Sequence, residues 1–178
     1  VGRFVGKEAL AAVGGSVNQI VNLVVEVFVG LTSGASVIVA QFYGAKDKKN
    51  LNKTLHTSYA FGIVTGFVVA VVGLLVTNTV LELMKTPQEL MADSRLYLHI
   101  YFCGMIFNII YNMGASILRA VGDSRRPLYV LMVTCGLNIV LDILLVVIFR
   151  LGVMGVAIAT VSCQGISSIL VTAMLMKE

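Results

Sequence analysis

The residue with the clearest chemical potential is Asp142, because it is the only charged side chain in the apolar stretch 128–149. As a helix, that stretch measures about 33 Å, which is enough to cross a bilayer. Arg150 directly follows it, which places Asp142 about 12 Å inside, near the midplane. A carboxylate at that depth costs about 2.5–3.5 kcal/mol on insertion scales, so it needs a polar partner, a cavity or an ion.

Other oxygen-bearing residues are spaced to reach Asp142. Thr134 and Asn138 precede it at four-residue steps, and residues at that spacing share one face of a helix. The next apolar segment returns after a turn near residue 151, and Thr160 lies about as far from this turn as Asp142 does. We therefore predict that Asp142, Asn138 and Thr160 form a site for Na⁺ or a proton, since hard cations prefer such oxygens. The alternative is a structural hydrogen-bond network between helices, and threonine often bonds its own helix backbone.

Further polar residues recur at four-residue steps inside other apolar segments. Asn22 and Glu26 lie in the first segment, and Asn108 and Asn112 lie in the third. Together with Thr134, we predict that they line a substrate cavity. Asparagines also serve as hydrogen-bonding contacts between membrane helices, and Glu26 could instead pair with a helix outside this chain.

The composition is that of an integral membrane protein. The chain is 58% hydrophobic and 12% charged, and its mean hydropathy is +0.94, whereas soluble domains are about 25% charged. The net charge of +4 comes from short basic runs between apolar segments, which indicates membrane topology rather than nucleic-acid binding. We find no P-loop, nucleophile elbow or metal-hydrolase motif, and we predict a protein that is not an enzyme and has no cofactor.

Five apolar segments predict an all-α fold with five transmembrane helices, at residues 14–43, 55–84, 96–121, 128–149 and 154–176. Eight basic residues then fall on one side of the membrane: Lys46, Lys48, Lys49, Lys53, Arg119, Arg125, Arg126 and Lys177. Five fall on the other side: Arg3, Lys7, Lys85, Arg95 and Arg150. The positive-inside rule predicts that the 44–53 and 121–126 turns are cytoplasmic, in a multi-pass protein of the cell (inner) membrane.

Several motifs resemble the multidrug and toxic compound extrusion (MATE) family. They are the Gly-Arg-Phe-Val-Gly start at residues 2–6 and the segments 34–47, 119–127, 136–142 and 155–164. The resemblance implies that residues 1–178 are helices two to six of a six-helix N-terminal lobe. The first helix and the C-terminal lobe would then lie outside this chain as its partners. It also implies that Asn138, Asp142 and Thr160 match a family cation site, which a further Asp on the first helix would complete.

The function that the resemblance implies is secondary antiport, in which organic cations or drugs leave the cell in exchange for Na⁺ or H⁺. One alternative is a lipid-linked oligosaccharide flippase of the same broader superfamily. A dense cationic cavity would favour that alternative, and no Lys or Arg lies within the membrane interior of these segments. A second alternative is a membrane structural or interaction module that transports nothing.

Overall fold

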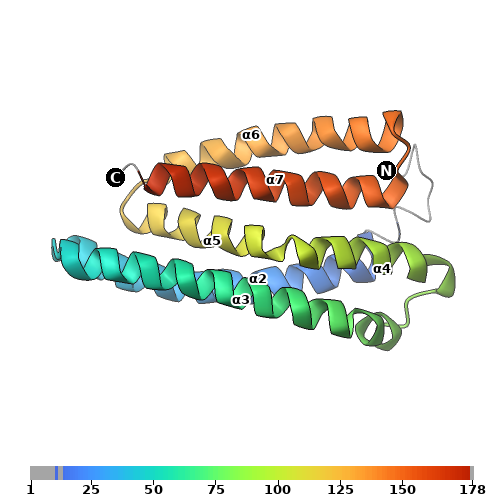
Figure 1. The fold of residues 1–178 in the computed structure, drawn as a ribbon, viewed down its shortest axis with the longest axis horizontal. Coiled ribbons are helices and arrows are strands. Elements are labelled where there is room, and N and C mark those ends of the chain that lie inside the picture. The colour runs from blue at the N-terminus through green and yellow to red at the C-terminus, as the bar shows by residue number, and fades with distance from the viewer. Residues whose placement is uncertain (1–10, 12–13, 177–178) are drawn as a thin grey trace.

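The computed structural model describes residue 11 and residues 14–176, which form a bundle of long antiparallel helices (Figure 1). Its elements are α2 (Ser16–Gly44), α3 (Lys48–Leu83), α4 (Gln88–Cys103), α5 (Met105–Ala120), α6 (Arg125–Asp142), the π-helix η1 (Ile143–Ile148) and α7 (Gly152–Leu175). The Gly-Arg-Phe-Val-Gly motif, Arg3, Lys7 and Lys177 lie outside the described residues.

The fold confirms a helical membrane protein with up to five spans. Four helices are long and apolar enough to cross a bilayer, counting α6 together with η1, and α4 with α5 makes a fifth. The third segment was expected to be continuous, but α4 and α5 meet at an angle of 50° around Gly104. Gly104 has φ −85° and ψ −3°, which departs from α-helical geometry but is open to residues other than glycine. Glycine is needed there because a Cβ would lie 2.5 Å from both Cγ atoms of Val161.

Helix α5 is the centre of the bundle, since it packs against α2, α3 and α7 (Figure 1). Its inward face buries Met105, Ile109 and Met113. Gly66 on α3 lets the two helices approach closely, because a Cβ there would lie 3.0 Å from the Ile106 Cα. Gly62, one turn earlier, would meet only side-chain atoms at 3.6 Å or more. Of these two glycines, Gly66 is thus the one that fixes the separation between α3 and α5.

Two helix starts differ from the sequence boundaries. Helix α3 begins at Lys48 rather than near residue 55, because the Asp47 carboxylate accepts hydrogen bonds from the Asn50 backbone N–H (3.1 Å) and side-chain amide (2.7 Å). Helix α4 begins at Gln88, directly after Pro87, so the first turns before residue 96 are helical. Both differences extend helices into polar segments that hydropathy alone assigns to turns.

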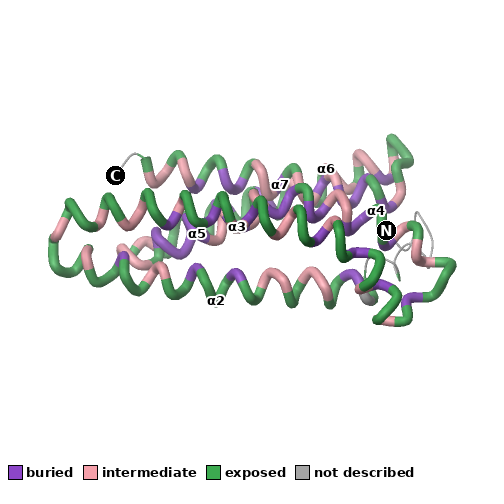
Figure 2. Tube along the Cα trace, turned by 60° about the horizontal axis from the view of Figure 1, so that its bottom comes forward, coloured by how far each residue is buried: buried purple, intermediate pink, exposed green. Residues whose placement is uncertain are grey.

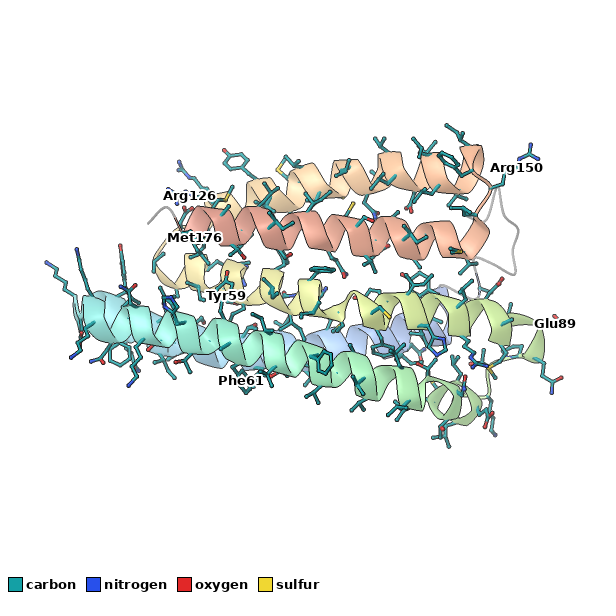
Figure 3. The ribbon with its side chains drawn as sticks, in the orientation of Figure 1. Tyr59, Phe61, Glu89, Arg126, Arg150 and Met176 are labelled. Carbon is teal, nitrogen blue, oxygen red and sulfur yellow. The ribbon has the colours of Figure 1, made fainter. Side chains whose placement is uncertain are left out.

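The two ends of the bundle differ in charge. The turns after α2 and α5 lie at the same end, as the segment order predicted, and we call this the basic end (Figure 1). Within the described residues it carries seven basic and two acidic side chains: Lys46, Lys48, Lys49, Lys53, Arg119, Arg125, Arg126, Asp47 and Asp123. The opposite end carries three basic and three acidic side chains among the described residues: Lys85, Arg95, Arg150, Glu82, Glu89 and Asp93. Figure 3 labels Arg126 at the basic end and Arg150 and Glu89 at the opposite one.

Candidate functional site

Asp142 lies where the backbone changes its helical form. It is the last residue of α6, and the six residues after it form η1, whose π-helical turns are wider and shorter than α-helical ones. Asp142 is therefore nearer to Arg150 along the helix axis than an unbroken α-helix would place it. Single π-turns inside longer helices are frequent at functional sites, so this irregularity singles out the same residue as the sequence did.

Close packing between η1 and α7 fixes which residues face each other. A Cβ on Gly155 would lie 3.2 Å from the backbone of Leu145, so these two positions are level with each other. Thr160 lies five residues beyond Gly155 on α7, and five residues before Leu145 is position 140 on the facing helix. Thr160 is therefore level with the part of α6 between Asn138 and Asp142. The Asn138 side chain lies near the Cys163 thiol, which agrees with this register. The structure thus brings the three predicted residues into one region, and all three are partly buried.

Helix α4 adds two tyrosines to this region that sequence reasoning missed. Tyr97 and Tyr101 are buried and stack in parallel, with ring centroids 6.1 Å apart. The Tyr97 hydroxyl lies near Thr160 and close enough to the Asp142 carboxylate to interact with it electrostatically. Tyr101 accepts a hydrogen bond of 3.4 Å from the amide of Gln164, one turn beyond Thr160 on α7. The polar cluster consists of Tyr97, Tyr101, Asn138, Asp142, Thr160 and Gln164.

Several oxygens of the polar cluster are free to accept. Within the described part of the chain, the buried Asp142 Oδ1 and Gln164 Oε1 have no hydrogen-bond partner. The Thr160 hydroxyl donates its proton to the Val156 carbonyl (2.9 Å), so its lone pairs face outward as acceptors. A buried acceptor without a partner costs about 1–3 kcal/mol. A cation or a bound proton would remove that cost at Asp142, and no described group of three His, Cys, Asp or Glu residues suggests a transition-metal site instead.

Several of the residues predicted for a substrate cavity form hydrogen bonds within their own helices. The buried Thr134 donates its hydroxyl to the Val130 carbonyl (2.8 Å), within its own helix. Asn112 donates to both oxygens of Asn108 at 2.9 Å, so these two amides bond each other along α5 rather than bridging helices.

Asn22 and Glu26 lie on the exposed side of α2, away from the polar cluster. Figure 2 shows α2 along one border of the bundle, with most of its length exposed. Asn22 donates to Asn18 (3.3 Å) on the same helix. Further along, Gly30 and Gly34 have no described atom within 4 Å of a Cβ position. An acid, amides and small residues therefore share an uncovered helix face, which suits contact with protein or a water-filled passage better than contact with lipid.

This chain has several apolar spans and an acidic, oxygen-rich cluster between them. These features are typical of polytopic membrane proteins in which intramembrane carboxylates mark ion or proton pathways. The comparisons with known proteins agree, since residues 1–144 match the MatE family. This chain belongs to that family. It is 37% identical over 165 residues to the probable multidrug resistance protein YoeA of Bacillus subtilis, covering 90% of this chain and 35% of that protein.

Two further relatives extend the comparison. The chain is 33% identical over 169 residues to the probable multidrug resistance protein YpnP of Bacillus subtilis, covering 94% of this chain and 37% of that one. It is 28% identical over 127 residues to the multidrug export protein MepA of Staphylococcus aureus, with coverage of 71% and 28%. The chain therefore spans about a third of the length of the curated relatives that it matches.

The fold is also similar to solved transporter structures. It superimposes on an inward-facing MATE family transporter of the MOP superfamily with a TM-score of 0.91 and 27% identity, over 97% of this chain and 39% of that one. An outward-facing MATE family transporter gives a TM-score of 0.88 and 27% identity, over 96% and 38%. One helical arrangement thus resembles transporters in two opposite conformations.

Proposed function

We propose that this chain is part of a secondary antiporter that exports organic cations or drugs in exchange for Na⁺ or H⁺. It would form most of the N-terminal lobe, and the rest of the protein would supply the first helix and a second lobe. The observation that carries the proposal is the Asp142 carboxylate, which lies in the polar cluster with a buried oxygen that has no hydrogen-bond partner among the described residues. The multidrug proteins among the relatives support the substrate class.

In this proposal the polar cluster alternates between two occupancies. With a cation bound, Asp142 stays ionised, and Asn138 and Thr160 contribute neutral oxygens. When the cation leaves, Asp142 takes a proton or gains a partner from a rearranged helix, because a bare carboxylate at this depth is costly. The cation favours whichever of the inward- and outward-open conformations binds it more tightly. Its occupancy therefore biases which side of the membrane is open.

The nearly equal similarity to inward- and outward-facing structures supports a lobe that moves as one body during this cycle. Alternating access in secondary transporters is largely the rocking of one repeat against another. The exposed face of α2 with Glu26 and Asn22 would then border the substrate passage between the lobes. The basic end would face the cytoplasm, in the cell (inner) membrane.

The test is Asp142→Asn in the complete protein, reconstituted in liposomes with a Na⁺ or a proton gradient and ethidium as the organic cation. We expect ion-driven ethidium export to fall at least about ten-fold, while expression and thermal stability are retained because removing the charge lowers the insertion cost. Glu89→Gln, an exposed acid in the first turn of α4, is the matched control and should transport normally. Export by Asp142→Asn at the wild-type rate under either gradient would refute the role of Asp142.

A further inference from the structure

A pocket at the basic end joins four helices. It has a volume of about 530 Å³ and lies among the end of α2, the start of α3 and the ends of α5 and α7. Its floor is apolar and its rim is cationic. Leu51, Leu55, Ile117 and Leu175 line the floor, and Lys46 and Lys48 line the rim. The pocket therefore offers charge at its mouth and hydrocarbon beneath, at the level where the spans leave the bilayer.

Among the described residues, the positive charge at the rim has no acidic partner of its own. Within the described residues, no ion pair joins Lys46 or Lys48 to an acid. The Asp47 carboxylate between them accepts two hydrogen bonds from Asn50. The other acid at this end, Asp123, is paired with Arg126 at 2.9 Å. The excess of basic over acidic side chains at this end favours an anionic ligand.

The backbone at the rim places a lysine where glycine would be easier. Lys46 has φ +56°, the left-handed conformation that commonly closes a helix and that favours glycine. The turn is closed by the Lys46 N–H donating to Tyr43 (3.1 Å) and the Asp47 N–H donating to Phe42 (3.0 Å). Glycine would make the same turn without a side chain, so removing the amine need not disturb the turn.

We propose that this pocket binds an anionic phospholipid from the adjoining leaflet. The phosphate lies between the Lys46 and Lys48 ammonium groups, and an acyl chain lies along the floor. A free phosphate ion would leave the apolar floor unfilled, and a choline head group would place a further positive charge beside the two lysines. The bound lipid ties the α2–α3 turn to the ends of α5 and α7. This site requires only that the chain spans a bilayer, so it is independent of the transport proposal.

The test uses the complete protein in nanodiscs that contain equal amounts of phosphatidylglycerol and phosphatidylcholine, with native mass spectrometry of the released protein. We expect retained phosphatidylglycerol on the wild type. Lys46→Gly and Lys48→Gln should each reduce that retention about five-fold, the usual weight of one basic residue at an anionic surface. Lys46→Gly should also keep or raise thermal stability in detergent, because it relieves the left-handed backbone.

Lys85→Gly is the matched control. Lys85 has nearly the same backbone conformation (φ +52°) directly after α3, but it lies at the opposite end and lines no part of this pocket. It should leave phosphatidylglycerol retention unchanged. Equal retention in Lys46→Gly, Lys48→Gln and wild type would overturn the proposal, as would an equal loss in Lys85→Gly.

Two further measurements identify the occupant. Excess soluble glycerol phosphate should not displace the lipid, because it cannot fill the floor, and full displacement would show a simple phosphate site. A photo-crosslinking residue at position 52, which lines the pocket, should form adducts with phospholipid. Adducts only with another segment of the protein would show that protein fills the pocket and would overturn the lipid assignment.

Discussion

Replacing Gly104 with alanine tests whether one close approach holds the bent span against α7. The added Cβ would lie 2.5 Å from both Cγ atoms of Val161 and 3.0 Å from its Cβ, whereas carbon atoms prefer about 3.5–4.0 Å. Rotating the valine does not relieve this clash, because its Cβ cannot move and its methyl groups already occupy both near positions. The α4–α5 junction must therefore move away from α7 by about 1 Å.

The expected cost follows from two opposing terms. Overpacking costs about 1–3 kcal/mol, and replacing glycine in a helix gains up to about 1 kcal/mol. We expect a net loss of about 1–2 kcal/mol, which lowers the Tm of the complete protein by about 1–3 °C, because the shift per kcal/mol shrinks as the chain lengthens. The assay is thermal unfolding of the complete protein in detergent, followed by size-exclusion chromatography. Tyr97 shares α4 with this junction, so Gly104→Ala should also weaken its contact with Thr160 and reduce coupling-ion affinity.

Two variants serve as controls for Gly104→Ala. Gly136→Ala, on α6, adds a Cβ with no described atom within 4 Å, and it should leave the Tm unchanged or raise it. Val161→Ala removes the two clashing methyl groups, so combining it with Gly104→Ala should recover at least half of the loss. A Tm for Gly104→Ala equal to that of the wild type, or no recovery in the double variant, would refute the reasoning.

Three further outcomes follow from the packing and the hydrogen bonds. Gly66→Ala should lower the Tm by about 1–3 °C while Gly62→Ala changes it little, because only the first Cβ meets backbone on α5. Hydrogen bonds from Asn50, the backbone one foremost, lower the pKa of Asp47. The stabilisation of the α3 N-terminus by Asp47 should therefore be fully present above the usual carboxyl pKa near 3.8 and lost as pH falls through the lowered folded pKa. The measurement is proteolysis of the α2–α3 turn, which should become faster in acid. Thr160→Ala should weaken Na⁺ binding, measured by calorimetry, more than Thr134→Ala, although both hydroxyls bond their own helices.

The spans could be predicted from the sequence because hydropathy and turn residues determine them directly. Long apolar runs must be helical in a bilayer, where each backbone polar group needs a partner. The bend at Gly104 could not be predicted in this way. Glycine occurs at many positions of these helices, and Gly73 and Gly114 also have side chains close to their Cβ positions in unbroken helices, so only the packed structure reveals where the span bends. The same holds for the six residues of η1, which read as an ordinary apolar helix.

The candidate site was predictable on one hairpin and not beyond it. Asp142, Asn138 and Thr160 are close in sequence to a shared turn, so equal distances from the turn suffice to bring them together. Tyr97 belongs to a different segment, and its position relative to Thr160 depends on how α4 packs on α7. A tyrosine near the start of an apolar segment is also typical of the membrane interface, so its residue type alone favoured a different role. The contact with Thr160 could be found only from the tertiary structure.

The uncovered polar groups indicate where the rest of the protein must contact this bundle. Glu26 on α2 is exposed, and Asp142 is only partly buried and retains an oxygen that has no hydrogen-bond partner among the described residues. Lipid cannot cover either carboxylate cheaply, and snorkelling is limited for side chains so short and so far from the helix ends. We therefore expect protein or water, rather than acyl chains, beside both residues. For Asp142 the group that completes the cation's oxygen ligands would come from outside this chain, so a cation site built only from the described oxygens would bind more weakly than the site in the complete protein.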